Sequence, residues 1–475
     1  MAPIKEQSPS GRQFGARFTF PLLLGSTLNP INSSMIATGL VGIAADFHTG
    51  PGQAATLVSV LYLCSAVMQP TMGKLSTLFG PRRIFLIGIG VLFIGGAIGA
   101  LAPAFGFLLF SRALIGVGTS AAYPTAMALV RRRADEQRIG VPSRVLGNFS
   151  IASQITTVFG LPIGGVLAGA FGWRALFLVN LPLAIIVFVF AFRGIARDPR
   201  PSNESGNIVT AIDLPGIALF AAGIVALLLF LSNLTSPNWW LLAVAAILLA
   251  VFVVWDAKIE RPLIDVRMLG RNAPLQRTYL RQTIIGLGIY SALYGASQWM
   301  EQGAGLSPFS VGLILLPLSA VSIVLARINS NKGWIRYPLI GGAVALILTG
   351  ALILLIDHTS NILVISLIAM TILFGVSNGF SGFANQAALY LQAPAEEIAV
   401  AAGLYRTFGY IGAIFSASLI GIVFGTTITD AGFHRLGWVI LGIGAASTLL
   451  TVFDQHIPVL AQPDKPTAKT PVPSP

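Results

Sequence analysis

The chain has 475 residues, of which 55% are hydrophobic and 10% are charged, and its mean hydropathy is +0.81. A soluble globular domain carries roughly 25% charged residues, so this composition excludes a protein whose whole surface faces water. The net charge of +12 would suggest nucleic acid in a soluble protein. In a membrane protein, basic cytoplasmic loops explain it, and we predict no nucleic-acid partner.

Apolar segments of about 20 residues, the length that crosses the hydrocarbon core of a bilayer, follow one another along the chain. They predict an all-α integral membrane protein with 14 transmembrane helices. The expected helices lie at 18–45, 54–76, 84–104, 107–130, 145–169, 175–192, 208–231, 237–255, 279–302, 309–327, 337–356, 361–390, 398–425 and 435–453.

Basic residues predict the orientation of these helices. With both termini in the cytoplasm, 25 of the 29 Lys and Arg fall in inner segments, and only Arg174 and Arg435 fall outside. Arg112 and Arg406 remain inside predicted helices. This asymmetry predicts a multi-pass protein of the cell (inner) membrane with both termini cytoplasmic.

Helix spacing predicts two six-helix bundles with a helix pair inserted between them. Residues 197–207 read as a flexible cytoplasmic linker, because they are polar and rich in Pro, Gly and Ser. The predicted parts are a cytoplasmic N-tail (1–17), an N-terminal bundle (18–195), the inserted pair (208–255), a cytoplasmic loop (256–278), a C-terminal bundle (279–453) and a disordered C-tail (454–475).

No set of residues predicts catalysis or a bound metal. Cys64 is the single cysteine, and the four histidines are scattered near the ends of predicted helices. The sequence has no Walker loop, nucleophile elbow or HExxH motif. We therefore predict a protein that is not an enzyme and that has no cofactor.

The loop "GKLSTLFGPRRIF" joins the second and third predicted helices. Gly73 and Gly80 would allow close backbone approach, and Arg82 and Arg83 could meet acids or helix C-termini. It reads as a gate between helices or, equally, as an ordinary basic loop.

Two further motifs lie in the fourth and fifth predicted helices. "SRALIGVGTSAAYPTAMALV" places Arg112 in an apolar span, where a charge needs a partner, water or helix carbonyls to cap. "GLPIGGVLAGAFGW" predicts close helix packing or a hinge through small residues. Its motif residues are Gly160, Pro162, Gly164, Gly165 and Gly169.

These three motifs, in this order, resemble the major facilitator superfamily, and the two extra central helices resemble its 14-helix drug:proton antiporter branch. "GWRALFLVNLP", "IDLPG", "GLSPFSVGLILLP" and "AAGLYRTFGYIGA" also look like that branch. The resemblance implies the major facilitator fold, a central cavity, alternating access, and export driven by proton entry.

The chain departs from the family pattern at its acidic positions. The acid of the family's first-helix motif aligns with Asn32, and the acid of the gate loop aligns with Thr77. The second-half copy of that loop has Ser330 at the acid position. The usual proton acceptor of the branch is therefore missing.

Glu301 stands where the family pattern normally has Gln. It is predicted to be the one acid inside a span, on a helical stripe with Tyr290, Tyr294 and Gln298. Desolvation would raise the pKa of such a carboxyl group toward neutral. We predict that Glu301, with Arg112 and Arg406, couples transport to protons; the alternative is an acid at the water boundary that couples to nothing.

Other polar and aromatic groups inside the helices predict a cavity for amphipathic organic molecules, although interhelical hydrogen bonding could explain each of them. The predicted cavity residues are Asn29, Asn32, Tyr62, Gln69, Tyr123, Gln154, Tyr290, Tyr294, Gln298, Asn378, Asn385 and Tyr410.

The favoured function is a proton-coupled, monomeric exporter of amphipathic organic compounds, with a small organic substrate, protons and the lipid bilayer as partners. The main alternative is a carrier for one metabolite or siderophore, either an importer or an uncoupled facilitator. A non-transporting membrane sensor or scaffold and an intramembrane enzyme are weaker alternatives, because no loop is long enough to fold alone and no catalytic set appears.

Overall fold

The computed structural model describes residues 14–199, 212–425 and 427–460. Apart from one isolated bridge between Trp334 and Leu460, these residues form only helices, turns and loops. Among them, 11 helices are long and apolar enough to cross a membrane. The chain therefore has an all-helical, multi-pass membrane fold, as its composition predicts.

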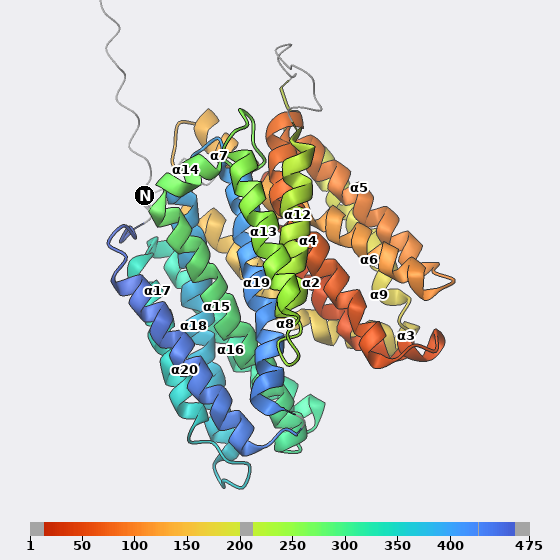
Figure 1. Ribbon diagram of the computed structural model, residues 1–475, viewed down its shortest axis with the longest axis vertical. Coiled ribbons are helices and arrows are strands. Elements are labelled where there is room, and N and C mark those ends of the chain that lie inside the picture. Colours follow the sequence, from red (N-terminus) through yellow and green to blue (C-terminus); the bar gives the residue numbers. More distant parts are fainter. Residues whose placement is uncertain (1–13, 200–211, 426, 461–475) are drawn as a thin grey trace, which may run out of the picture.

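The first half of the chain forms a group of tilted helices (Figure 1). The first predicted segment is three consecutive pieces, and Pro21 and Pro30 lie within its first helix. The elements are α2 (Ala16–Met35), η1 (Ile36–Gly39), α3 (Leu40–Asp46), α4 (Pro51–Phe79), α5 (Pro81–Ala100), α6 (Phe105–Ser120), α7 (Ala122–Glu136), α8 (Ser143–Phe171), α9 (Ala175–Leu178) and α10 (Asn180–Gly194).

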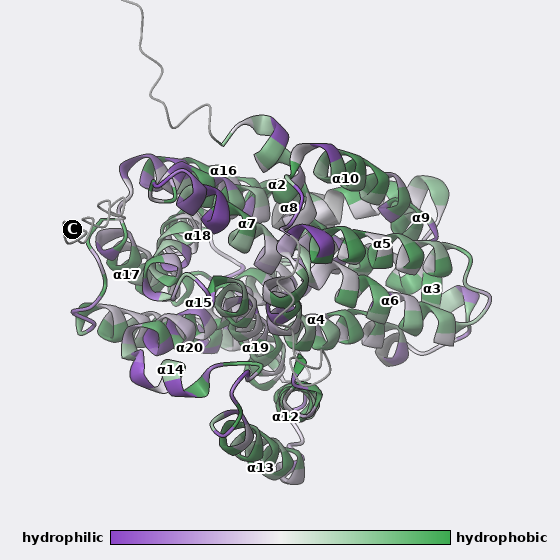
Figure 2. Cartoon of the chain, turned by 90° about the horizontal axis from the view of Figure 1, so that it is seen from above, coloured by the Kyte–Doolittle hydropathy of each residue, from purple (hydrophilic) through white to green (hydrophobic). Residues whose placement is uncertain are grey.

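The second half forms a second group, which lies on the opposite side of the molecule when it is viewed from above (Figure 2). Side-chain caps start several of these helices; Asn272 accepts from the Leu275 amide, for example, and Thr429 from the Gly432 amide. The elements are α14 (Val266–Arg271), α15 (Ala273–Gln298), the π-helical turn η2 (Trp299–Gly303), α16 (Pro308–Lys332), α17 (Arg336–Ile353), α18 (Leu363–Gln392), α19 (Ile398–Phe424) and α20 (Asp430–Val452).

The helices α12 (Leu214–Leu231) and α13 (Trp239–Asp256) form a pair at the side of the molecule (Figure 2). α12 contacts α4 and α19, whereas α13 packs mainly on α12. The fully apolar surface of α13 includes the exposed Trp239, Trp240 and Ile247. Such a surface suits lipid, because hydrocarbon does not penalise exposed apolar side chains.

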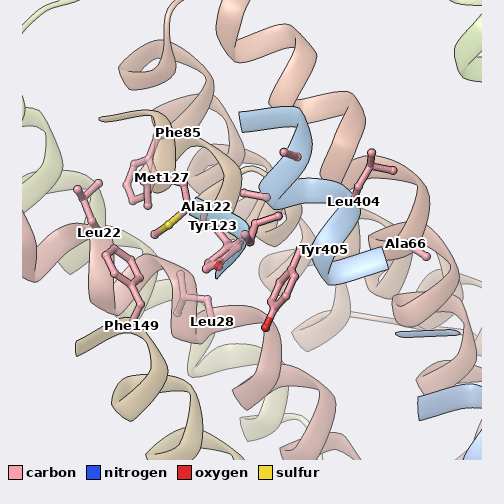
Figure 3. Packing of buried hydrophobic residues seen from close by; sticks show 14 of the residues in the cluster. Leu22, Leu28, Ala66, Phe85, Ala122, Tyr123, Met127, Phe149, Leu404 and Tyr405 are labelled. Atoms are coloured by element: carbon pink, nitrogen blue, oxygen red, sulfur yellow. The ribbon is translucent and has the colours of Figure 1, made fainter. Parts of the chain in front are cut away.

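The two halves share one buried hydrophobic cluster. Figure 3 shows part of it, where Tyr123 of α7 lies between Phe149 of α8 and Tyr405 of α19. A second cluster lies wholly in the second half, around Trp299 and Phe433, whose stacked rings are 4.1 Å apart. The halves are thus joined by apolar packing around α4, α7, α8 and α19.

The segment after α20 differs from the prediction of a disordered tail. Ile457 is buried, and the amide of Ile335 donates to the carbonyl of Val459 at 3.1 Å. Asp454, fully buried, accepts from Arg281 at 2.9 Å and from Arg277 at 2.8 Å. The prediction is therefore wrong for residues 454–460, because a buried ion pair and a backbone bridge hold them. Residues 461–475 and the N-tail up to residue 13 lie outside the described residues.

Two of the motif glycines in α8 are close-packed and two are open. A Cβ at Gly164 would lie 2.8 Å from the carbonyl oxygen of Met35, and a Cβ at Gly160 would collide with Ser34. Nothing lies within 4 Å of a Cβ at Gly165 or Gly169. Pro162 lies within α8, and its side chain is outside the described residues. The packing face predicted for this motif is therefore narrower than its glycine content suggests.

We expect Gly164→Leu to lower the free energy of unfolding by about 1–3 kcal/mol, the usual cost of overpacking a tight contact. Gly165→Leu, one residue along the same helix, should leave it nearly unchanged. Thermal unfolding of both variants in the same detergent measures the difference. Equal unfolding temperatures would contradict the close packing of α8 on α2 and η1.

Candidate functional site

A cavity of about 740 Å³ lies between α8, α15, α16, α18 and α19. Its wall is mainly apolar, with Ile285, Ile289 and Phe374 among the lining residues. Amide and hydroxyl groups are set among these apolar side chains, and Arg406 and Glu301 are the two charged residues of the lining. This combination suits a drug-sized organic molecule, because an apolar wall with few polar groups is typical of ligand sites.

Six of the predicted site residues line this cavity, and nine do not. The lining residues are Gln154, Tyr290, Tyr294, Glu301, Asn378 and Arg406. The nine that lie elsewhere are Asn29, Asn32, Tyr62, Gln69, Arg112, Tyr123, Gln298, Asn385 and Tyr410.

The predicted stripe on α15 is correct at three of its four positions. Tyr290, Tyr294 and Glu301 line the cavity, but Ser297 rather than Gln298 stands between them. Helical geometry explains the correction, since 100° per residue puts positions 290, 294, 297 and 301 on one face. The rings of Tyr290 and Tyr294 stack with their centroids 5.8 Å apart.

Glu301 lies in the π-helical turn η2, at the end of the cavity lining farthest along α15. Its side chain is exposed, so the predicted desolvation is wrong. Among the described residues, no hydrogen bond or ion pair joins it to another side chain. The π-turn explains this placement: it buries Trp299 and Met300 against the second core and leaves Glu301 facing the cavity.

Several predicted cavity residues instead form a hydrogen-bond network between the two halves. The Asn29 amide donates to Ser65 and to Thr119, both at 2.8 Å, and accepts from the Tyr410 hydroxyl at 2.7 Å. Gln69 also donates to the Tyr410 hydroxyl, at 2.8 Å. Tyr62 adds a ring contact with Tyr410, at 5.5 Å between centroids. These side chains therefore join α2, α4, α6 and α19, which is the interhelical alternative.

Arg112 is 1% exposed and meets backbone carbonyls in place of a carboxylate. Its Nε donates to the Leu57 carbonyl at 3.0 Å, and its Nη1 donates to the Asn32 carbonyl at 3.3 Å. The second terminal nitrogen, Nη2, is buried without a hydrogen-bond partner. The side chain of Asn32 is occupied elsewhere, donating to Asn180 at 2.7 Å. Arg112 thus connects α6 to α4 and α2.

Arg112→Ala should abolish active transport, because it removes the side-chain donor that joins α6 to the Leu57 and Asn32 carbonyls of two other helices. Arg112→Lys should restore only part of the activity, since an ammonium group cannot present a planar fork of donors. Transport by equal amounts of reconstituted protein measures this, with Arg435→Ala, an exposed arginine of α20, as the control. Full activity of Arg112→Ala would reduce Arg112 to an anchor.

Arg406 projects from α19 into the cavity lining. Its guanidinium carbon lies 4.1 Å from the centroid of the Tyr123 ring, within cation–π distance. Its Nε is buried and has no hydrogen-bond partner. Tyr123 itself is 3% exposed and belongs to the shared hydrophobic cluster. Its ring therefore packs against the Arg406 guanidinium group from the protein interior and does not line the cavity.

Asn385, predicted as a cavity residue, belongs to a buried polar cluster. It donates to Gln282 at 3.0 Å and accepts from Arg281 at 3.3 Å. Arg281 is fully buried and pairs with Asp454. Sequence reasoning counted Arg281 only among the basic residues of the inner segments and missed this ion pair, because its acid lies 173 residues away in the chain.

The loop between α4 and α5 is bound by Asp198, a residue that the sequence placed in a flexible linker. Asp198 accepts from the backbone amides of Arg82 and Arg83, at 3.3 and 2.9 Å, and pairs with Arg132 at 3.1 Å. Gly80 has a φ of +94°, and a Cβ there would collide with Asp198. The requirement for glycine at this position is therefore both conformational and steric.

The two arginines of this loop act differently. The Arg82 guanidinium donates to the Phe192 carbonyl at 2.9 Å and lies 5.0 Å from the centroid of the Phe192 ring. The Arg83 side chain is exposed, and only its backbone amide takes part. The predicted gate role is consistent with the contacts of Arg82 and is not supported for the side chain of Arg83.

The two halves meet closely at the end that carries these basic loops, here called the basic end and defined by 80–83, 131–138 and α14. A Cβ at Gly73 would lie 2.6 Å from the carbonyl oxygen of Ala399, and one at Gly403 would lie 2.5 Å from that of Gln69. On the other side of the interface, Arg327 donates to Asn148 at 3.0 Å. The cavity is therefore closed at the basic end by α4 against α19 and by α8 against α16.

Two acids at the base of the inserted pair were also missed. Asp213 and Asp256 are 3% and 0% exposed. Asp213 accepts from Trp255 and from the amides of Gly216 and Leu263, whereas Asp256 accepts from the Ile264 amide and has one oxygen without a partner. Their burial arises because the loop after α13 folds back over the start of α12.

Comparison with known proteins identifies the scaffold. The family model described as Major Facilitator Superfamily matches residues 22–417. The chain is 34% identical to the "Uncharacterized MFS-type transporter YwoD" of Bacillus subtilis (strain 168), over 92% of this chain and 96% of that protein. It is 26% identical to the "Multidrug efflux pump LfrA" of Mycolicibacterium smegmatis, over 85% of this chain and 79% of that protein.

A solved structure supports the fold alone. The human organic anion transporter MFSD10 (TETRAN) aligns with a TM-score of 0.58 and 14% sequence identity, covering 92% of this chain and 99% of that one. The family model and the curated relatives, rather than this structure, confirm the resemblance that the ordered motifs indicate and are consistent with the drug:proton antiporter branch.

Proposed function

This chain belongs to the Major Facilitator Superfamily and is one of its transporters, and we propose that it exports amphipathic organic compounds by proton-coupled alternating access. The observation that carries the proposal is the cavity of about 740 Å³, closed at the basic end and lined by apolar walls with scattered polar groups. A multidrug efflux pump among the relatives supports this class of substrate.

The proposed topology has 14 membrane-spanning helices in two six-helix bundles, with α12 and α13 as the inserted pair. The 11 helices that meet the length and hydropathy criteria are joined in this proposal by α2, α8 and α15. Polar groups lower the mean hydropathy of α2 and α15, and such groups are expected where a helix faces a cavity or a buried network.

The basic end is proposed to face the cytoplasm, with both termini on that side of the cell membrane. Its loops carry most of the Lys and Arg residues, as the positive-inside rule requires. In that orientation the structure corresponds to an outward-facing state, in which the cavity releases substrate. We propose a monomeric transporter without catalytic activity.

Glu301 is the proposed proton carrier, and Arg112 and Arg406 complete the proposed coupling set. Glu301 lines the cavity and is accessible there. Asp46 is a poorer carrier: hydrogen bonds from Trp173 and Arg174 lower its pKa, so it stays ionised throughout the physiological range.

A second candidate is an uncoupled carrier of one metabolite or siderophore, working in either direction. One observation favours it: Asn32 occupies the usual acid position and is bonded to Asn180, and no described carboxylate pairs with Arg112. This chain therefore lacks the first-helix acid through which the family resemblance implies proton coupling.

One experiment separates the two candidates. Purified protein is reconstituted into liposomes with a pH-sensitive dye inside, and fluorescent amphipaths are added with and without a pH gradient. Proton-coupled export predicts substrate-dependent proton movement and uphill accumulation that a protonophore abolishes. Downhill movement without proton flux would support the uncoupled carrier, and no movement of any compound would contradict both.

A further inference from the structure

Arg406 is a cation in the cavity lining that no acid of the described residues neutralises. Its positive group rests on the Tyr123 ring at 4.1 Å, and its buried Nε has no hydrogen-bond partner. Arg406 is half-buried, and a guanidinium group that lines a mainly apolar cavity without an anionic partner favours a ligand that can accept its hydrogen bonds. The cavity therefore presents unused donor capacity beside an apolar wall.

The other charged lining residue is too distant to satisfy Arg406. Gln282 of α15 lies beside Gly409, three residues along α19 from Arg406. Glu301 follows Gln282 by 19 residues, which places it roughly 28 Å farther along the helix axis at 1.5 Å per residue. That separation exceeds the Debye length of roughly 8 Å at physiological ionic strength.

The other buried guanidinium group, that of Arg112, is too far away to add to this charge. Arg112 contacts the Leu57 carbonyl, whereas Thr407, next to Arg406, contacts the Ala66 carbonyl. Nine residues of α4 separate these two carbonyls, which is roughly 14 Å along the helix axis. Arg406 therefore gives this part of the cavity wall its positive potential, which would attract an anion and repel a cation of the same shape.

We infer that the substrates of this cavity are amphipathic organic anions, whose carboxylate or sulfonate binds Arg406. This inference rests on the proposed function, in which the cavity carries an organic substrate. Arg406 supplies the fork of donors that suits a planar carboxylate. Ile285, Ile289 and Phe374 supply the surface on which the apolar part of the molecule packs.

A negative charge on the substrate also gives export a source of energy. An anion leaving the cytoplasm moves down the membrane potential of a cell that is negative inside. A potential of 100 mV supports roughly a fifty-fold outward ratio for a monovalent anion, given the work done per unit charge. This drive needs no acid at position 32, where the chain has Asn32.

Three probes with one fluorophore and different charges test the inference. Dansylglycine is anionic, dansylethylenediamine is cationic and dansylamide is neutral at pH 7. Their affinities are measured by fluorescence on purified full-length protein, and their movement is measured in liposomes with an imposed potential. The variants are Arg406→Gln, Arg406→Lys and, as a matched control, Arg435→Gln, which removes an exposed arginine of α20 outside the cavity lining.

Dansylglycine should bind about tenfold or more tightly than dansylethylenediamine, the usual scale for a charge-assisted contact. Arg406→Gln should remove that preference and leave dansylamide binding intact, Arg406→Lys should retain part of it, and Arg435→Gln should change nothing. An outside-positive potential should accelerate dansylglycine export. Equal or tighter binding of the cation to the unaltered protein, or an unchanged preference in Arg406→Gln, would overturn the inference while the transport function stands. Absence of binding and movement of all three probes would overturn the proposed function as well.

Discussion

Replacing Gly73 with leucine should leave the protein inserted in the membrane but lower its transport rate by about tenfold to a hundredfold. A Cβ at this position would lie 2.6 Å from the carbonyl oxygen of Ala399 and 2.8 Å from the amide nitrogen of Val400. Neither backbone atom can move aside as a flexible side chain would. Overpacking of this kind costs about 1–3 kcal/mol. Each 1.36 kcal/mol lowers the population of the state that is closed at the basic end by a factor of about ten.

The control is Gly90→Leu, on α5, because nothing lies within 4 Å of a Cβ at Gly90. In a background where Cys64 is replaced by serine, a cysteine introduced in place of the cavity residue Ser150 reports on closure. Gly73→Leu should increase its labelling by a maleimide applied from the basic end, and Gly90→Leu should not. Wild-type transport and labelling in Gly73→Leu would show that the α4–α19 contact is not a gate.

The helices were predictable from sequence because each has to match the thickness of the bilayer. Apolar length alone indicates a span such as α5 or α13, and tertiary contacts hardly alter it. The breaks within the first segment, at η1 and α3, were not predictable in this way. They are conformational changes inside a continuous apolar run, and hydropathy does not register them.

Motif glycines were predictable as positions of close approach, but their partners were not. The positive φ of Gly80 agrees with a tight turn, whereas its neighbour Asp198 comes from a polar stretch more than 100 residues later. The same limit applies to Asp454, which lies in a stretch whose proline content favoured disorder. In the sequence, a short polar segment that supplies one buried acid has the same composition as a tail that is exposed to solvent.

Cavity residues were predicted correctly where helix periodicity decides the face, as for Tyr290 and Tyr294. They were predicted wrongly where a polar group could bond to a neighbouring helix, as for Asn29 and Tyr410. Both arrangements satisfy a buried polar group equally well. The sequence therefore identifies polar positions inside spans, and only the packing decides between a ligand contact and an interhelical bond.

The acid count along the chain was also incomplete. The sequence predicts Glu301 as the single acid within a span, yet Asp256 is the last residue of α13 and is 0% exposed. Its burial depends on the loop that returns Ile264 over it, at 3.0 Å from amide to carboxylate. A test of proton coupling therefore has to compare these two acids.

Glu301→Gln should abolish uphill, proton-driven transport while substrate binding and downhill exchange persist. Glutamine keeps the size and polarity of a protonated glutamate but cannot release a proton. Folding should survive, because Glu301 is exposed and makes no ion pair among the described residues. With one proton exchanged per substrate, a pH difference of one unit supports about a tenfold substrate ratio in the unaltered protein, since one unit equals 1.36 kcal/mol. In Glu301→Gln that ratio should fall to one when no membrane potential is present.

Asp256→Asn is the matched comparison, because it removes the other acid at a span end without changing the cavity lining. Uphill transport should persist in Asp256→Asn, since Asp256 lies at the basic end and has no access to the cavity in the closed state. Both variants are measured in liposomes with the membrane potential clamped to zero, so that only the pH gradient drives transport. If Asp256→Asn fails and Glu301→Gln accumulates substrate at the wild-type rate with the same pH dependence, the coupling proton is carried at the base of the inserted helix pair. If both variants keep the ratio of the unaltered protein, the coupling proton is carried by neither acid. If the unaltered protein itself accumulates no substrate under the pH gradient, that gradient does not drive this transporter, and the charge of the substrate is left as its source of energy.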